Sequence, residues 1–341
     1  MTHRERTLAA IRHETTDRVP VDAICIETIP ELAEHLGIAQ EAVLDRLGID
    51  GRIVAAGYTG EMPPGEYITE WGTSWRCDYS VDRGCYPLSG VSTIAEIERC
   101  RWPDPADYDY AGAGEAARSL GDSYAMRGPY WNPIFCRALD LFGMEEAMAN
   151  MSLEPVLFEA VIERVYEYLA EYCRRLITAC GDSMPILCLA DDFATQRGLM
   201  ISPEQWRRFL KPRYAGLFEI GKRSGKLIWF HSCGDITSVL PDLVEIGMDV
   251  WETVQLHALP MTASELKREY GRHLCFFGGV NTQHLPFAKP DEIREEVRRC
   301  IEILGDGGGY ICGPDHHIKP DVPPENTAAL FDAATGRPTP T

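Results

Sequence analysis

In the second half of the chain, short apolar segments alternate with amphipathic segments of helical period. This alternation constrains the fold more than any other feature. The apolar segments predict strands at 184–190, 226–230, 249–251, 273–278 and 309–311. Capping boxes that begin at Ser202 and Thr262 mark the starts of two helices, and further helices are predicted at 236–244 and 291–304. Strands that alternate with helices in this way form a parallel sheet.

The number of these units favours an α/β fold of the closed (β/α)8 TIM-barrel type over an open sheet. Earlier barrel strands are predicted at 19–26 and 124–128, and residues 154–180 predict one long helix. Residues 58–108 hold many prolines, glycines and tryptophans and little periodicity. We interpret them as an inserted loop region that covers the surface or acts as a lid. One barrel domain is therefore expected over residues 1–341.

Charge and cysteine usage exclude several classes of protein. The net charge is −19 at pH 7, which argues against nucleic-acid and anionic membrane partners, because both attract basic patches. No run approaches the ~18 apolar residues of a membrane span, and the first residues lack the apolar stretch of a signal peptide. Most of the 12 cysteines lie inside apolar patterns, without a CxxC pair or a disulfide-like spacing. These features predict a cytoplasmic protein with reduced thiols.

Polar and metal-binding residue types follow one predicted strand after another. In a (β/α)8 barrel the active site lies at the carboxyl ends of the strands. The residues found there are Asp191, Asp192, His231, Cys233, Glu252, Gln255, Gly279, Asn281, Cys312, Asp315, His316 and His317. A random surface would not gather titratable groups at one end so consistently, so this convergence predicts an enzyme. Structural alternatives stay open, since Asp191 or Asp192 can cap the following loop and Glu252 can be a solvated carboxylate.

The most specific of these groups is His231-Ser232-Cys233-Gly234, which directly follows an apolar run. In an extended segment, residues two apart point to the same side. His231 and Cys233 can therefore offer an imidazole and a thiolate to one metal ion, and zinc takes such nitrogen and sulfur ligands. A reduced pair of this kind can also be purely structural.

Three long blocks carry a family resemblance. They are DDFATQRGLMISPEQWRRFLKPRY at 191–214, FHSCGDITSVLPDLVEIGMDV at 230–250 and GGGYICGPDHHIKPDVPPEN at 307–326. Together with residues 1–21, they resemble the uroporphyrinogen decarboxylase superfamily over nearly the whole chain. The resemblance implies a (β/α)8 barrel preceded by an N-terminal helical extension, and a homodimer would fit the family.

One branch of the superfamily decarboxylates porphyrinogens and binds their carboxylates with an arginine-rich segment after the first strand. In this chain that segment, at 25–30, reads CIETIP and contains no arginine. Asp50 loosely matches the essential aspartate of the decarboxylases, and His316 falls where they keep a histidine. A metal-independent decarboxylase of a porphyrinogen-like or other small carboxylate, using Asp50 and His316, is therefore one alternative.

The other branch comprises methyltransferases that exchange a methyl group with a corrinoid protein. Several resemble this chain at His231 and Cys233, where an HxC motif binds zinc together with a cysteine near the last strand and sometimes a carboxylate. Aligned from the Pro-Pro-Glu-Asn at 323–326, that cysteine falls at His316, and Cys312 lies four residues earlier. Both are candidates for the third ligand, and Glu252 is the candidate carboxylate.

The resemblance thus implies a methyltransferase that acts between a protein-bound cobalamin and a small thiol, folate, methoxylated or quaternary-amine compound. Zinc would make a bound thiol nucleophilic, whereas a folate needs no zinc and would be held or protonated by a carboxylate. The candidate catalytic residues are Asp191, Asp192, Glu252 and His316. The candidate substrate-binding residues are Asp50, Gln255, Asn281 and His317. A non-catalytic corrinoid- or tetrapyrrole-binding protein is the third hypothesis, and its ligand binding would survive loss of His231 and Cys233.

Overall fold

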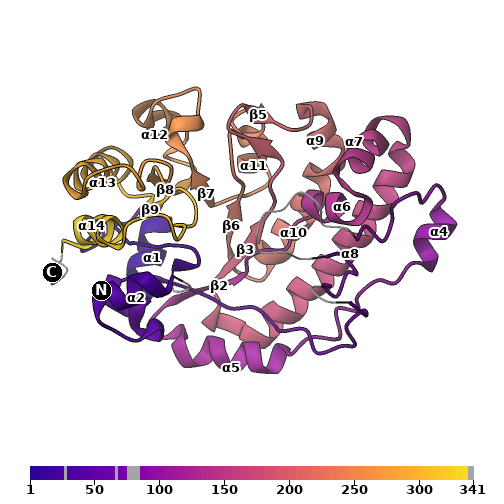
Figure 1. The fold of residues 1–341 in the computed structure, drawn as a ribbon, viewed down its shortest axis with the longest axis horizontal. Coiled ribbons are helices and arrows are strands. Elements are labelled where there is room, and N and C mark those ends of the chain that lie inside the picture. Colours follow the sequence, from indigo (N-terminus) through magenta and orange to yellow (C-terminus); the bar gives the residue numbers. More distant parts are fainter. Residues whose placement is uncertain (27–28, 66–67, 75–84, 337–341) are drawn as a thin grey trace.

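The centre of the molecule is a sheet of seven parallel strands (Figure 1). The computed structural model describes residues 1–26, 29–65, 68–74 and 85–336. In spatial order the strands are β1 (Gly51–Ile53), β2 (Ala125–Pro129), β3 (Ile186–Ala190), β6 (Leu227–His231), β7 (Val250–Val254), β8 (Cys275–Val280) and β9 (Tyr310–Pro314). A two-stranded hairpin, β4 (Ala194–Thr195) with β5 (Gly198–Leu199), follows β3.

Val21 joins the two edges of this sheet. It forms a parallel bridge with Cys312 of β9, and its carbonyl accepts the backbone N–H of Asp50, just before β1, at 2.7 Å. The sheet is thereby closed as the expected (β/α)8 barrel. The predicted strand at 19–26 is wrong in extent, since only this bridge forms. Pro20 has no N–H to donate, and Cys25 has a φ of 53°, which no strand tolerates.

Helices surround the strands. They are α1 (His3–Ile11), α2 (Pro30–Leu36), α3 (Val43–Leu47), α4 (Ile94–Arg99), α5 (Tyr110–Gly121), α6 (Phe135–Phe142), α7 (Met144–Leu153), α8 (Pro155–Cys180), α9 (Pro203–Phe209), α10 (Lys211–Arg223), α11 (Leu240–Glu245), α12 (Ala263–Tyr270), α13 (Pro290–Leu304) and α14 (Pro324–Thr335). In Figure 1, α13 and α14 lie together beside β8 and β9. No helix in the described ranges is long and apolar enough to span a bilayer.

Successive side chains of β6 point alternately into the barrel and outward to the helices, so an inner core is separate from an outer one. Trp229 points into the barrel, where it packs with Phe277 of β8 at a ring distance of 5.4 Å. Its neighbour Phe230 points outward and contacts Tyr214 and Phe218 of α10 at 4.8 and 5.7 Å. Successive side chains of a strand face opposite sides, so the inner residues of these strands form one layer and the outer residues pack the helices.

The helix predictions at Ser202, Thr262, 154–180 and 291–304 are confirmed as α9, α12, α8 and α13. Both predicted capping boxes form, with the serine and threonine hydroxyls accepting the backbone N–H three residues on. The helix predicted at 236–244 begins only at Leu240, where a proline occupies the first turn. The sequence does not predict β1, because its three residues carry a polar centre and no apolar alternation.

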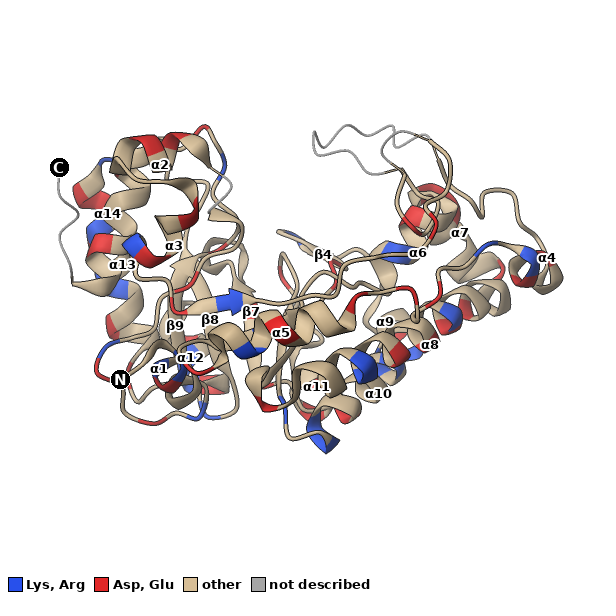
Figure 2. Ribbon diagram, turned by 90° about the horizontal axis from the view of Figure 1, so that it is seen from below, with Lys and Arg blue, Asp and Glu red and all other residues tan. Residues whose placement is uncertain are grey.

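Ion pairs tie the outer helices to one another. Figure 2 shows basic and acidic residues intermixed along α8 and α10. Arg213 pairs with Glu163 at 2.8 Å, and Arg208 pairs with Glu159 at 3.0 Å. The basic side chains of these helices are therefore matched by carboxylates instead of forming an uninterrupted basic surface.

The inserted region is fixed at its ends to α8. Tyr58 and Tyr108 form an antiparallel bridge, and the hydroxyl of Tyr168 on α8 donates to that of Tyr108. Tyr108 in turn donates to Glu70 at 3.1 Å. Residues 66–67 and 75–84 of this region lie outside the described residues, so a role as a lid stays a prediction.

Asp50 is the centre of a buried ionic network at the amino-terminal end of β1. It is 1% exposed and accepts hydrogen bonds from Arg6 at 2.6 Å, Arg18 at 2.7 Å and the backbone N–H of Val21 at 2.8 Å. His3 lies 2.7 Å from the same carboxylate. Burial raises the pKa of Asp50, but these partners outweigh it and hold the pKa below its ordinary value. The network therefore fastens α1 and the closing bridge to the barrel.

We expect Asp50→Asn to lower the free energy of unfolding by about 3–5 kcal/mol at pH 7, because it removes the buried carboxylate that Arg6 and Arg18 share and leaves Arg6 with Asp17 alone. Glu219→Gln, which breaks an exposed pair with Arg223, is the control and should cost less than about 1 kcal/mol. Urea unfolding measures both. The folded-state pKa of Asp50 lies below its unfolded value. Its stabilisation is therefore present above about pH 4 and is lost as the pH falls further. Equal losses in the two variants would contradict this role.

Candidate active site

The loop after β6 is held in place by side chains from neighbouring strand ends. The backbone N–H of Cys233 donates to Asp192 at 2.8 Å, and that of Gly234 donates to Gln255 at 2.8 Å. Gly234 has a φ of 84°, and a Cβ there would lie 2.5 Å from the carbonyl oxygen of Thr195. Only glycine fits such a position. The loop is therefore fixed before any ligand arrives.

Asp192, His231 and Cys233 bring three different metal-ligand atoms together. His231 Nε2 lies 3.5 Å from Cys233 Sγ and 3.7 Å from Asp192 Oδ1. One ligand atom from each of the three residues lies within 4.8 Å of the others. This group combines the nitrogen, sulfur and oxygen donors that zinc accepts in proteins.

Glu252 lies behind His231. Its Oε1 accepts from His231 Nδ1 at 2.9 Å and from the hydroxyl of Tyr130 at 2.9 Å, and the indole N–H of Trp229 donates to its other oxygen. In the neutral imidazole, the form that binds metals, a proton on Nδ1 leaves Nε2 with a lone pair that faces Cys233. The sequence offers Glu252 as a carboxylate ligand, but the structure places Asp192 in the cluster and Glu252 behind it.

The buried carboxylate of Glu252 remains ionised through its partners. Burial raises its pKa, yet the hydrogen bond from His231 and the positive charge of His231 and Arg127 bring the pKa below its ordinary value. Arg127 also pairs with Asp22 inside the barrel and lies 4.7 Å from the centre of the Trp229 ring. Arg127, inside the barrel, therefore helps to keep Glu252 negatively charged, and this carboxylate orients His231.

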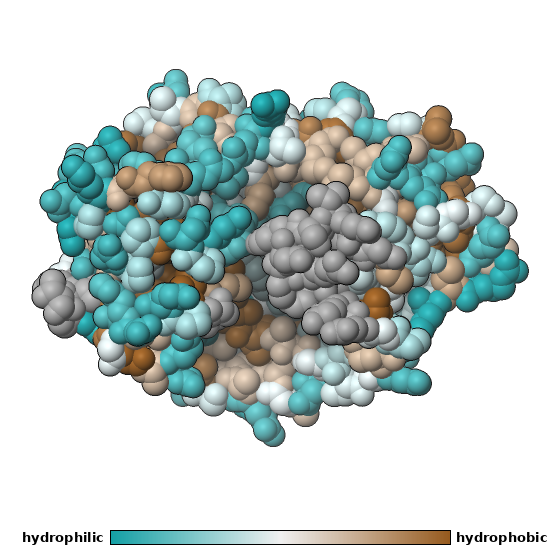
Figure 3. All heavy atoms as spheres, viewed as in Figure 1, coloured by the Kyte–Doolittle hydropathy of each residue, from teal (hydrophilic) through white to brown (hydrophobic). Residues whose placement is uncertain are grey.

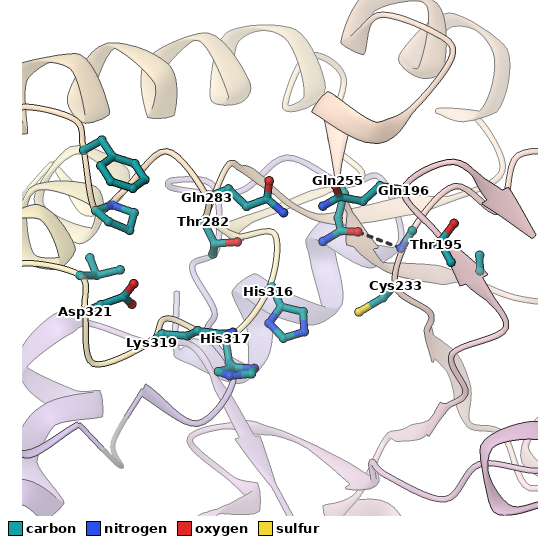
Figure 4. A pocket seen from close by; sticks show the side chains of 15 residues that line it. Thr195, Gln196, Cys233, Gln255, Thr282, Gln283, His316, His317, Lys319 and Asp321 are labelled. Carbon is teal, nitrogen blue, oxygen red and sulfur yellow. Dashed lines mark hydrogen bonds between the residues drawn. The ribbon is translucent and has the colours of Figure 1, made fainter. Parts of the chain in front are cut away.

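His316 completes the group on the side of the cavity. It lies in the loop after β9, and Figure 4 shows it and Cys233 at the same cavity. Burial raises the pKa of Cys233, but the charge and hydrogen bond of His231, with a smaller contribution from His316, lower it below its ordinary value. The thiolate form, which binds metals, is therefore more accessible here than in an ordinary cysteine.

Cys312 lies elsewhere. It belongs to β9, not to the loop beyond it, and strand alternation turns it outward together with Tyr310. There it is fully buried in the core between the strand and Cys300 of α13, and burial raises the pKa of its thiol to about 12. The structure does not bring Cys312 to His231 and Cys233, and of the two candidates for the third ligand only His316 lies beside Cys233.

Asp191 is a helix cap. Its carboxylate accepts the backbone N–H groups of Ile134, Phe135 and Cys136 at 3.1, 2.6 and 2.9 Å, and the hydroxyl of Tyr214 at 2.6 Å. Burial is the main cause that raises its pKa, to about 6. All these donors surround the beginning of α6. This arrangement corresponds to the structural alternative for Asp191 and leaves its neighbour Asp192 to face the cluster.

Of the remaining candidate site residues, two line the cavity next to Cys233 and two lie elsewhere. Gln255 and His317 line a cavity of about 500 Å³ next to Cys233. Asn281 lines a separate cavity of about 250 Å³, and its side chain accepts the backbone N–H of Gln283. Asp50 lies at the amino-terminal end of β1, opposite the strand ends that carry the cluster. The structure therefore brings neither Asp50 nor Asn281 to the cluster.

The main cavity has residues that the sequence does not single out. Figure 3 shows that the face seen in Figure 1 is hollowed near its centre, with hydrophilic residues around part of the opening. The additional polar or charged lining residues are Thr195, Gln196, Thr282, Gln283, Lys319 and Asp321. Tyr130 and Trp229, which hold Glu252, are further omissions. Tyr130 is the first residue after β2, and Thr282 is the second residue after β8. If the expectation that active-site residues lie at the carboxyl ends of strands is applied to every strand, it predicts both.

Comparisons with known proteins agree with this fold. The model of the uroporphyrinogen decarboxylase (URO-D) family matches residues 84–337, and the chain belongs to this family. Methylcobamide:CoM methyltransferase MtaA of Methanosarcina barkeri (strain Fusaro / DSM 804) is 24% identical, and the alignment covers 97% of each chain. A uroporphyrinogen decarboxylase of Pseudoalteromonas translucida (strain TAC 125) is 34% identical over 72% of this chain and 69% of the relative.

The solved structure of a methyltransferase from Methanosarcina mazei has the same fold. Its TM-score is 0.65 at 21% sequence identity, and the match covers 98% of this chain and 99% of that chain. The resemblance to the uroporphyrinogen decarboxylase superfamily is confirmed. These relatives are methyltransferases and decarboxylases, which supports an enzyme.

Replacement of Asp191 and of its neighbour Asp192 should change the free energy of unfolding by different amounts. We expect Asp191→Ala to lower the free energy of unfolding by roughly 2–4 kcal/mol, because it leaves buried N–H groups at the start of α6 without an acceptor. Asp192→Ala removes a half-exposed carboxylate and should cost about 1 kcal/mol. Chemical denaturation of both variants measures the difference. A stable, inactive Asp191→Ala protein would favour a catalytic role for Asp191 instead.

Proposed function

We propose that the chain is a corrinoid-linked methyltransferase, which moves a methyl group between a cobalamin on a partner protein and a small molecule at the barrel mouth. The observation that carries this proposal is the group of Asp192, His231 and Cys233 beside the cavity of about 500 Å³, which His316 also lines. The full-length similarity to methylcobamide:CoM methyltransferase MtaA supports the corrinoid as co-substrate.

The donor set fits a zinc ion. Asp192, His231 and Cys233 supply oxygen, nitrogen and sulfur, and His316 supplies a further nitrogen beside the thiol. When bound, zinc lowers the pKa of a coordinated thiol and so keeps a thiolate nucleophile available at neutral pH. We therefore propose His231, Cys233 and Asp192 as ligands, with His316 rather than Cys312 as the additional ligand.

Neighbouring residues orient the proposed ligands and limit the access of water to them. Glu252 holds the imidazole of His231 in one orientation, and Tyr130 and Trp229 hold Glu252. Asp192 has a second task, because it also accepts the backbone N–H of Cys233. Since His231 is nearly fully buried, little water reaches its side of the cluster. Cys233 lines the cavity, so a small molecule can approach it there.

Porphyrinogen decarboxylation has less support, although decarboxylases are among the relatives. A porphyrinogen carries many carboxylates, and of the described residues that line the cavity only Lys319 is a lysine or arginine. Asp50, which that mechanism would use, is enclosed by Arg6 and Arg18 at the other end of the barrel. A passive tetrapyrrole-binding protein would not need the metal-ligand cluster.

A cytoplasmic location is part of the proposal. Apart from Cys25, ten cysteines of the described residues are free thiols. Cys233 acts in the proposed site only in its reduced form, and the cytoplasm keeps thiols reduced.

We expect the purified protein to contain about one zinc per chain, and Cys233→Ala to lose it, because the thiolate is the strongest of the proposed donors. Cys312→Ala is the matched control and should keep its zinc. His316→Ala should bind zinc more weakly than His317→Ala, since only His316 lies at Cys233. Metal analysis of untreated protein measures these contents. Loss of zinc in Cys312→Ala with retention in Cys233→Ala would reverse the ligand assignment.

Methyl transfer tests the activity itself. The zinc-loaded protein should demethylate free methylcobalamin in the presence of a small thiol, and Cys233→Ala should lower the rate at least about a hundredfold, a loss of roughly 2.7 kcal/mol. The absorbance change of the corrinoid measures the rate, and Cys312→Ala serves again as control. Absence of methyl transfer with every thiol, folate and methoxylated compound, together with carbon dioxide release from a porphyrinogen, would replace the proposal with decarboxylation.

A further inference from the structure

Part of the wall of the main cavity next to Cys233 consists of uncharged hydrogen-bonding side chains. They come from the β4–β5 hairpin and from the loops after β7 and β8, and they are Thr195, Gln196, Gln255, Thr282 and Gln283. Figure 4 shows these side chains around the same space as Cys233 and His316. A substrate that reaches Cys233 must therefore pass amides and hydroxyls.

Two of these side chains have their orientation fixed by other contacts. The oxygen of Gln255 accepts the backbone N–H of Gly234 at 2.8 Å, which leaves its NH₂ group as a donor toward the cavity (Figure 4). The hydroxyl of Thr282 donates to the fully buried carboxylate of Asp315 at 2.6 Å, which leaves its oxygen as an acceptor. The wall thus presents a preset donor and a preset acceptor.

The fixed charges among the described residues that line the cavity have opposite signs. Lys319 and Asp321 both belong to the loop after β9, two residues apart. Carboxylates and sulfonates are usually bound by arginine, whose planar guanidinium donates two parallel hydrogen bonds, and the described lining contains no arginine. The net charge of −19 further disfavours an anion at this site.

We propose that the small-molecule substrate of this cavity is uncharged and carries an amide, hydroxyl or ether group, which Gln255 and Thr282 recognise. This inference rests on the proposed methyltransferase function and names its substrate class. It separates the chain from an enzyme for anionic thiols, because a carboxylate or sulfonate against this wall would lose its hydration without gaining a cation from the wall itself.

A pair of compounds of equal size tests the inference. 3-(Methylthio)propionamide and 3-(methylthio)propionate have the same number of heavy atoms and the same methyl thioether, and they differ in charge. Calorimetric titration of the purified wild-type protein should show the amide binding at least about tenfold more tightly. Equal or tighter binding of the carboxylate, or binding of neither compound, would overturn the inference.

A variant with an added cation gives an independent check. Gln283→Lys places an ammonium at the exposed edge of the wall, and it should strengthen binding of the carboxylate about tenfold without strengthening that of the amide. Ala116→Lys adds the same charge on the exposed side of α5, at a residue that does not line the cavity, and it should change neither affinity. Identical affinity changes in the two variants would contradict recognition at this wall.

The binding test needs no corrinoid, so it separates the two proposals. If the amide preference is found and methylcobalamin is never demethylated, the methyltransferase proposal fails and the substrate class stands. If 3-mercaptopropionate is methylated faster than 3-mercaptopropionamide, the substrate class fails and the methyltransferase proposal stands.

Discussion

The hydrogen bond between Glu252 and His231 is the interaction on which the candidate site depends. These two residues lie opposite each other in the pairing of β6 with β7, so the sheet register itself brings the carboxylate to the imidazole. A buried carboxylate is costly unless it is paired, and Glu252 is also bonded by Tyr130 and Trp229. Because Nδ1 is engaged, Nε2 is the nitrogen that faces Cys233. The orientation of the site is thus determined inside the barrel, before the loops contribute.

The two ends of the barrel have different tasks. At the amino-terminal end, Asp50 joins Arg6 and Arg18, and the chain uses a buried ionic network for stability. At the carboxyl end, Asp192, His231 and Cys233 bring possible metal-ligand atoms together beside a cavity. Barrel enzymes generally separate stability and chemistry in this way, which explains why an aspartate near a strand is not by itself evidence of catalysis.

Much of this arrangement could be predicted from local sequence, and the remainder depended on contacts that no local pattern contains. Helix caps and strand ends located His231 and Cys233 correctly at the end of β6, since both signals are short-range. Cys312 could not be placed without knowing that β9 continues to Pro314: the predicted end at 311 leaves Cys312 in the loop, whereas within the strand it points outward like Tyr310. Asp191 accepts backbone N–H groups of residues more than fifty positions earlier, and no spacing along the chain indicates them.

Asp192 accepts the backbone N–H of the very residue whose thiol lies beside it, and Gly234 locks the same loop against Thr195. The ordering of the loop is therefore completed during folding, not at the moment of metal capture. A preorganised set of this kind does not couple metal uptake to the creation of structure, as small zinc-dependent domains do. Discrimination among metal ions would then follow from the softness of the thiolate and the fixed spacing of the donors, and exchange of the ion would leave the surrounding barrel as it is.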